Sequence, residues 1–82
     1  MPKIPRDISG QKLAQLLFQY GYKIGRQKGS HIRLATKRNN LKHHVTIPAH
    51  DFIKIGTLNN ILSDVASFMN IDKKDLIDKL FS

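Results

Sequence analysis

Apolar residues recur at helical spacing in three separate segments of the chain. The apolar side of the first segment consists of Leu13, Leu16, Leu17 and Tyr20. Ser9 lies just before this segment and is a suitable N-cap, while Gly21 follows it and can adopt the left-handed conformation that ends many helices. The spacing therefore predicts a first helix over residues 10–20.

The second and third helical segments lie in the last third of the chain. Their apolar sides consist of Leu58, Ile61, Leu62, Val65 and Phe68, and then of Leu76, Ile77 and Leu80. Thr57 is the expected N-cap of a helix over residues 58–69, which Asn70 closes. Asp72 is expected to cap a short C-terminal helix that runs through residue 80.

Between the first and second helices, apolar and polar residues alternate in the way that is typical of β-strands. Residues 22–27, 30–36 and 43–48 are the predicted strands, joined by a tight turn at Lys28-Gly29 and by a basic loop over residues 37–40. The two-residue period places Ile32 and Leu34 on one face and His31 and Arg33 together on the other.

The order helix, three strands, helix, helix predicts an α+β fold. A three-stranded antiparallel sheet should carry its helices on one face. The length of 82 residues suits one small domain, so we expect residues 1–82 to fold as a single unit.

Charge is distributed unevenly along the chain. The net charge is +8, and residues 1–54 hold 11 Lys or Arg and two Asp, whereas residues 55–82 hold three Lys and four Asp. This asymmetry favours a surface that faces a polyanion such as a nucleic acid. The ordinary alternative is that the cations only keep a small domain soluble. No apolar run approaches the length of a membrane span, and there is no cysteine, so we expect a cytoplasmic protein with no membrane contact.

One stretch, Arg26-Gln27-Lys28-Gly29-Ser30-His31-Ile32-Arg33, combines a histidine with several cations. Histidine changes charge near neutral pH, so His31 can give or take a proton in the cell. Cleavage of RNA needs a base for the 2′-hydroxyl, an acid for the leaving 5′-oxygen and cations for the charge on the phosphate. A minimal set of these groups is present in His31, Lys28 and Arg33.

A wider group of residues is expected to bind RNA phosphates around His31. This group consists of Arg26, Lys28, Gly29, Ser30, Arg33, Lys37, Arg38 and Lys42. Gly29 and Ser30 also have an ordinary explanation in turn chemistry. Tyr22 and Phe52 are the aromatic residues best suited to stacking on bases.

Other kinds of active site find little support. The chain has no cysteine nucleophile, no Gly-x-Ser-x-Gly turn and no Walker-type phosphate loop. His43 and His44 are neighbours and would point to opposite faces of a strand, so they are poorly placed to chelate one metal ion. For these two and for His50 we favour the reading of satisfied polar residues, and we expect no metal and no cofactor.

Several matched stretches show that the chain resembles a known family over residues 8–69. They are Tyr20-Gly21-Tyr22, the stretch from Arg26 to His31, Val45-Thr46-Ile47-Pro48 and Ile55-Gly56-Thr57-Leu58-Asn59-Asn60-Ile61-Leu62. In this order they resemble the HicA family of toxin mRNA interferases, also called the YcfA-like family.

The resemblance implies a fold like the double-stranded-RNA-binding domain, with the order α-β-β-β-α. It also implies a toxin that cleaves mRNA, arrests growth and is neutralised by a HicB-type antitoxin, with His31 as the catalytic histidine and no required cofactor. Two other hypotheses stay open: a non-catalytic RNA-binding module of the same fold, and a protein-interaction module whose basic face docks an acidic partner.

Overall fold

The computed structural model describes residue 4 and residues 7–81. Its elements are α1 (Gly10–Leu17), the 3₁₀ turn η1 (Phe18–Tyr20), β1 (Lys23–Lys28), β2 (His31–Arg38), β3 (Leu41–Pro48), α2 (Ile55–Met69) and α3 (Lys73–Phe81). This order confirms the predicted α+β fold, including the extra C-terminal helix.

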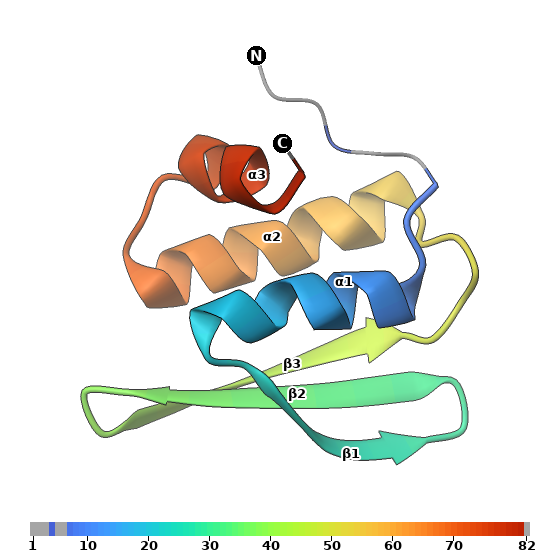
Figure 1. Cartoon of the computed structure of the whole chain (residues 1–82), viewed down its shortest axis with the longest axis horizontal. Coiled ribbons are helices and arrows are strands. Elements are labelled where there is room, and N and C mark those ends of the chain that lie inside the picture. Colours follow the sequence, from blue (N-terminus) through green and yellow to red (C-terminus); the bar gives the residue numbers. More distant parts are fainter. Residues whose placement is uncertain (1–3, 5–6, 82) are drawn as a thin grey trace.

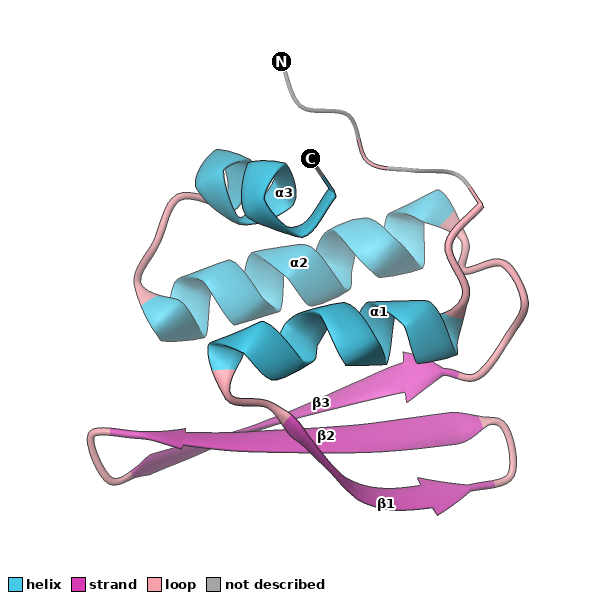
Figure 2. Cartoon of the chain, viewed as in Figure 1, coloured by secondary structure: helices cyan, strands magenta, loops and turns pink. Residues whose placement is uncertain are grey.

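The three strands form one antiparallel sheet in the order β1-β2-β3, so β2 is central. All three helices lie on the same side of this sheet (Figures 1 and 2). Helices α1 and α2 pack directly on the sheet, and α3 lies beyond them against α2. The opposite face of the sheet carries no helix, and we call it the open face.

The core lies between the sheet and its helices. Its fully buried members include Ile32, Leu34 and Ile47 from the sheet, Leu13 and Leu17 from α1, and Leu58, Leu62 and Val65 from α2. Along β2 exposed and buried side chains alternate, which confirms the predicted two-residue period. Strand β1 is exposed along its whole length because the helices leave this edge uncovered.

Most of the predicted helix ends are confirmed. The Ser9 hydroxyl accepts a hydrogen bond from the Lys12 amide, and Gly21 and Asn70 both adopt the left-handed conformation where their helices end. The prediction for the start of α2 was wrong, because the N-cap is Lys54 rather than Thr57 and the helix begins at Ile55. Lys54 caps it through its backbone alone, since its carbonyl oxygen accepts the Leu58 amide.

The β2–β3 connection is shorter than predicted. Residues 37–40 do not form a loop, because β2 continues to Arg38 and β3 already begins at Leu41. Only Asn39 and Asn40 form the turn, and both have positive φ angles, of 52° and 67°. A turn with two left-handed residues matches the twist of the flanking strands, so their pairing continues up to it.

Gly10 brings the start of α1 into close contact with the end of β3. A Cβ atom on this residue would lie 1.9 Å from the carbonyl oxygen of Pro48. The Gly10 amide instead donates a hydrogen bond of 3.0 Å to the carbonyl oxygen of His50. Glycine is therefore needed here to let the helix approach the end of the sheet at which β2 begins.

Candidate functional site

The β1–β2 hairpin turns at Gly29 and Ser30, one residue later than the predicted turn at Lys28-Gly29. Gly29 has a φ of 57° and Ser30 does not have a positive φ. A positive φ at the first turn residue alone is typical of a type II′ turn, which favours glycine at that position. With the turn placed here, Lys28 ends β1, His31 begins β2, and the two residues pair across the strands.

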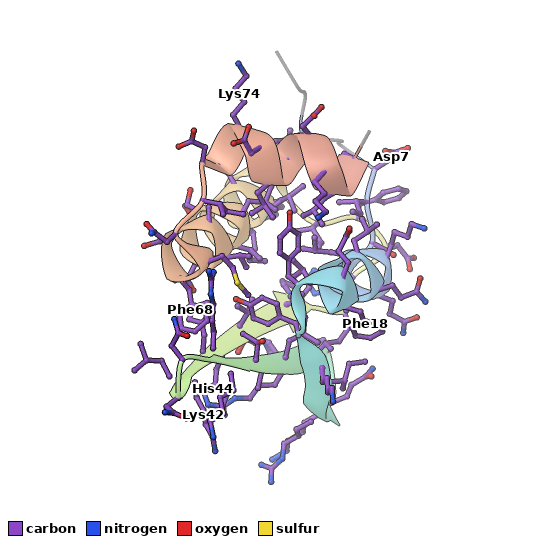
Figure 3. All side chains as sticks on the ribbon, turned by 60° about the vertical axis from the view of Figure 1, so that its left-hand side comes forward. Asp7, Phe18, Lys42, His44, Phe68 and Lys74 are labelled. Atoms are coloured by element: carbon purple, nitrogen blue, oxygen red, sulfur yellow. The ribbon has the colours of Figure 1, made fainter. Side chains whose placement is uncertain are left out.

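The open face carries the side chains that alternate with the buried ones. Strand register places on it Lys23, Arg26 and Lys28 from β1, His31, Arg33, Ala35 and Lys37 from β2, and Lys42, His44, Thr46 and Pro48 from β3. Among these described side chains none is acidic. Figure 3 shows Lys42 and His44 on this underside of the sheet, away from the helices.

His31 lies on the open face between two cations. Lys28 is its direct partner in β1, and Pro48 is its partner in β3. Arg33 follows two residues later on the same strand and therefore points to the same side. Directly opposed side chains in a sheet have Cβ atoms about 5 Å apart, so an anion at the His31 imidazole would also be within reach of Lys28.

Two pairs of like charges face each other on the same face. Arg26 is opposite Arg33, and Lys37 is opposite Lys42. Like charges directly opposite one another destabilise a sheet by a few tenths of a kcal/mol or more. A bound polyanion removes this repulsion, so the arrangement favours an anionic ligand along β2.

The sequence prediction treated the eight phosphate-binding candidates as one group, and the structure divides them. Five of them share the open face with His31, namely Arg26, Lys28, Arg33, Lys37 and Lys42. Gly29 and Ser30 form the turn that precedes His31. Arg38 points to the helix side. Its Nη1 atom donates a hydrogen bond of 2.5 Å to the carbonyl oxygen of Met69, at the end of α2.

His43 lies on the helix side of β3, opposite to His44, as the strand period predicts. Its Nδ1 atom is 2.7 Å from the Tyr22 hydroxyl, and its Nε2 atom is 3.2 Å from a carboxylate oxygen of Asp64. The ring also stacks on Phe68, with centroids 4.6 Å apart. His43 is therefore a satisfied structural residue, which confirms its predicted role.

Tyr22 was a predicted stacking residue, and this prediction was wrong. Only 1% of the residue is exposed, because it lies in the core with its hydroxyl on His43. Burial, and secondarily the charge of Asp64, raises the pKa of Tyr22 to about 12. Phe52, the other stacking candidate, is 66% exposed in the loop before α2 and is free to meet a base.

The described residues offer no ready place for a metal ion. Nowhere in residue 4 and residues 7–81 do three His, Cys, Asp or Glu side chains gather into a possible ligand set. The four acidic residues from Asp64 onwards lie on α2, on α3 and in the link between them, and so away from the open face. None of the described helices has the length and apolar character that a membrane span requires.

Two further residues, Lys23 and His44, also lie on the open face. From the sequence, Lys23 was not considered, and His44 was interpreted as a satisfied polar residue without a functional role. Both pair with Ala35, which the two-residue period puts on the same face as His31, but the sequence predicted no pairing between strands. Together with Tyr20, Lys37 and other neighbours, they line a cleft at the far end of β2. The cleft had no signal in the sequence, because it depends on the unequal lengths of β1 and β2.

A family model described as "HicA toxin of bacterial toxin-antitoxin" matches residues 10–66, which is more than half of the chain. The chain belongs to the HicA toxin family. It is thus the toxin of a toxin–antitoxin system, as the sequence resemblance indicated. The matched span of this HicA-family chain begins with α1, contains the whole sheet and ends within α2. Neither the curated proteins nor the solved structures gave a match.

Proposed function

We propose that the chain is a metal-independent endoribonuclease that cuts mRNA in the cytoplasm and acts as a single 82-residue domain. His31 is the general acid or base of the reaction. The observation that carries the proposal is the position of His31 on an open basic face, opposite Lys28 and two residues from Arg33. A proton-transfer group and two cations are thus within reach of one phosphate.

The proposed reaction is an internal transfer within the RNA chain. A base removes the proton of a ribose 2′-hydroxyl, and the 2′-oxygen attacks the adjacent phosphorus. The bond from phosphorus to the 5′-oxygen of the next nucleotide breaks, and that oxygen receives a proton from an acid. The products are a 2′,3′-cyclic phosphate and a free 5′-hydroxyl, and no water or metal ion enters the balance. His31 carries one of these two proton transfers.

The cations have two separate tasks in this proposal. Lys28 and Arg33 stabilise the charge that grows on the phosphate oxygens in the transition state, because they flank His31. Arg26, Lys37 and Lys42 hold neighbouring phosphates and so contribute affinity rather than rate. Gly29 keeps the turn narrow, and Ser30 is available to donate a hydrogen bond to a phosphate oxygen.

The neutralising partner is proposed to be a HicB-type antitoxin. Family membership implies an antitoxin, and the charge of the open face indicates how it would bind. A partner that presents carboxylates to the cations around His31 would exclude RNA by competition. Neutralisation by this route weakens as salt concentration rises, because it depends on charge.

Expression in a host that lacks the antitoxin tests the proposal. Wild type should arrest growth and fragment mRNA, whereas His31→Ala should do neither while keeping the same fold by circular dichroism. Growth arrest by both proteins with intact mRNA would favour a non-catalytic RNA-binding module. Fragmentation of mRNA by His31→Ala at the wild-type rate would exclude His31 as the acid or base.

A further inference from the structure

A cleft of about 700 Å³ lies at the end of β2 farthest from His31. The cleft passes around the edge of β2, so its lining comes from both sides of the sheet. Tyr20, Thr36, Arg38 and Met69 lie on the helix side, whereas Lys23, Ala35, Lys37, Lys42 and His44 lie on the open face. This volume lies within the range of pockets that hold small ligands. The cleft takes no part in the proposed cleavage at His31, so it calls for a separate explanation.

The cleft exists because β1 is shorter than β2. Pairing between these strands stops at Lys23 and Ala35, whereas β2 continues to Arg38. Backbone groups of β2 beyond Ala35 that point toward this edge therefore have no partner in β1. Ala35 also has a small side chain between Lys23 and His44, and this leaves a hollow in the open face.

The chemistry of the lining indicates the kind of ligand. On the open face the floor of the cleft is the apolar side chain of Ala35, and its rim carries the side chains of Lys23, Lys37 and Lys42. Among the described residues that line it none is acidic. A flat apolar group attached to phosphates fits this combination, and a nucleotide within an RNA chain has that character.

His44 gives the cleft a stacking surface. Its ring is exposed on the open face, in contrast to that of His43, which is half-buried and stacks on Phe68. Bases in single-stranded RNA stack on aromatic side chains, histidine included, while cations track the backbone. We propose that the cleft binds one nucleobase of the RNA, stacked on His44 over Ala35.

The distance to His31 sets the place of this base in the substrate. Ala35 is four residues from His31, or about 13 Å along the strand, and Lys37 is about 20 Å away. Stacked nucleotides rise by roughly 3.4 Å each, so these two distances correspond to about four and about six nucleotides between the cleaved bond and the bound base. A stretched RNA chain would span them with fewer nucleotides. The proposal rests on RNA as the substrate, and it gives the enzyme a contact that selects where His31 cuts.

The test measures how much the bases contribute to binding. The protein carries His31→Ala so that the RNA stays intact. Its dissociation constant is measured by fluorescence anisotropy for a single-stranded RNA hexanucleotide and for the same chain with all bases removed. The ratio of the two constants reports on base contacts alone, because both chains carry the same phosphates.

Variants of the cleft should change this ratio in a defined way. His44→Ala should reduce it by roughly five-fold or more, which is the usual effect of losing one stacking contact. Ala35→Leu, which fills the hollow, should reduce it similarly. His44→Phe should keep it, because a phenyl ring stacks without a charge. Thr46→Ala is the matched control on the same strand and face, and it should leave the ratio unchanged.

Other results would overturn the proposal. An unchanged ratio in both His44→Ala and Ala35→Leu would mean that no base occupies the cleft. A ratio reduced in His44→Phe as far as in His44→Ala would mean that the imidazole does not act by stacking. If His44→Ala and Ala35→Leu weaken antitoxin binding but leave the ratio unchanged, the cleft is occupied by a side chain of the antitoxin rather than by a base. Failure of the catalytic proposal appears separately, as full cleavage by the single His31→Ala variant.

Discussion

Replacing Tyr22 with phenylalanine removes one hydroxyl from the core and tests how the sheet is fixed to α2. That hydroxyl lies 2.7 Å from Nδ1 of His43, whose other nitrogen meets Asp64 on α2. Loss of a buried hydrogen bond that leaves a partner unsatisfied costs about 1–2 kcal/mol. For a domain of this size, the melting temperature near pH 7 should fall by about 5–15 °C.

The same variant should behave in the opposite way at alkaline pH. The pKa of Tyr22 is raised to about 12 in the folded protein, mainly by burial, whereas an unfolded tyrosine has a pKa near 10. Below pH 10 the hydroxyl is protonated in both states, so its contribution is fully present. Between pH 10 and 12 the unfolded state loses the proton first, and roughly 2–3 kcal/mol of stability is lost.

The assay is urea unfolding of wild type and Tyr22→Phe from pH 7 to pH 12. Their difference in free energy of unfolding should shrink above pH 10 and reverse near pH 12, because only the wild type carries the ionising group. Tyr20→Phe is the matched control and should keep the alkaline loss that Tyr22 causes. Parallel curves for wild type and Tyr22→Phe across this range would refute the reasoning.

Three further predictions concern packing, charge and chemistry. Gly10→Ala should lower the free energy of unfolding by about 1–3 kcal/mol, because the added methyl group meets the Pro48 carbonyl oxygen. Gly56→Ala, at the exposed start of α2, should be neutral or slightly stabilising by the same assay. Lys42→Gln should reduce the slope of log affinity for single-stranded RNA against log salt by about 0.7, whereas Lys74→Gln on α3 should not change it. These two lysines lie on opposite sides of the molecule (Figure 3), and equal effects would argue against a localised RNA-binding face. The rate of RNA cleavage should change between about pH 5 and 8, the range in which histidine changes charge, and should withstand EDTA. A flat rate from pH 5 to 9, or loss of activity with EDTA, would contradict the proposed chemistry.

The sequence was sufficient for the part of the site that depends on local periodicity. Alternation along β2 put His31 and Arg33 on the face opposite Ile32 and Leu34, and the structure has them there. This works because a strand has a fixed two-residue period and one face must be buried. Helix ends at Ser9 and Gly21 were predictable for the same local reason, since one side chain or one backbone conformation defines each of them.

Features that depend on the lengths of strands and turns were not predictable in this way. Arg38 was grouped with the basic loop, but the short asparagine turn extends β2 and carries the guanidinium to the end of α2. Tyr22 looked like an exposed strand residue, but it precedes β1 and enters the core beside His43. Both outcomes depend on contacts between residues far apart in the chain, which periodicity alone does not show.

The most direct test of the central claim compares purified wild type and His31→Ala on single-stranded RNA in the presence of EDTA. Wild type should release fragments that end in 2′,3′-cyclic phosphates. His31→Ala should cleave about 10²- to 10⁴-fold more slowly while keeping the wild-type melting temperature and affinity for an RNA made non-cleavable by 2′-O-methylation. Cleavage by His31→Ala at the wild-type rate would contradict the claim that His31 performs the proton transfer.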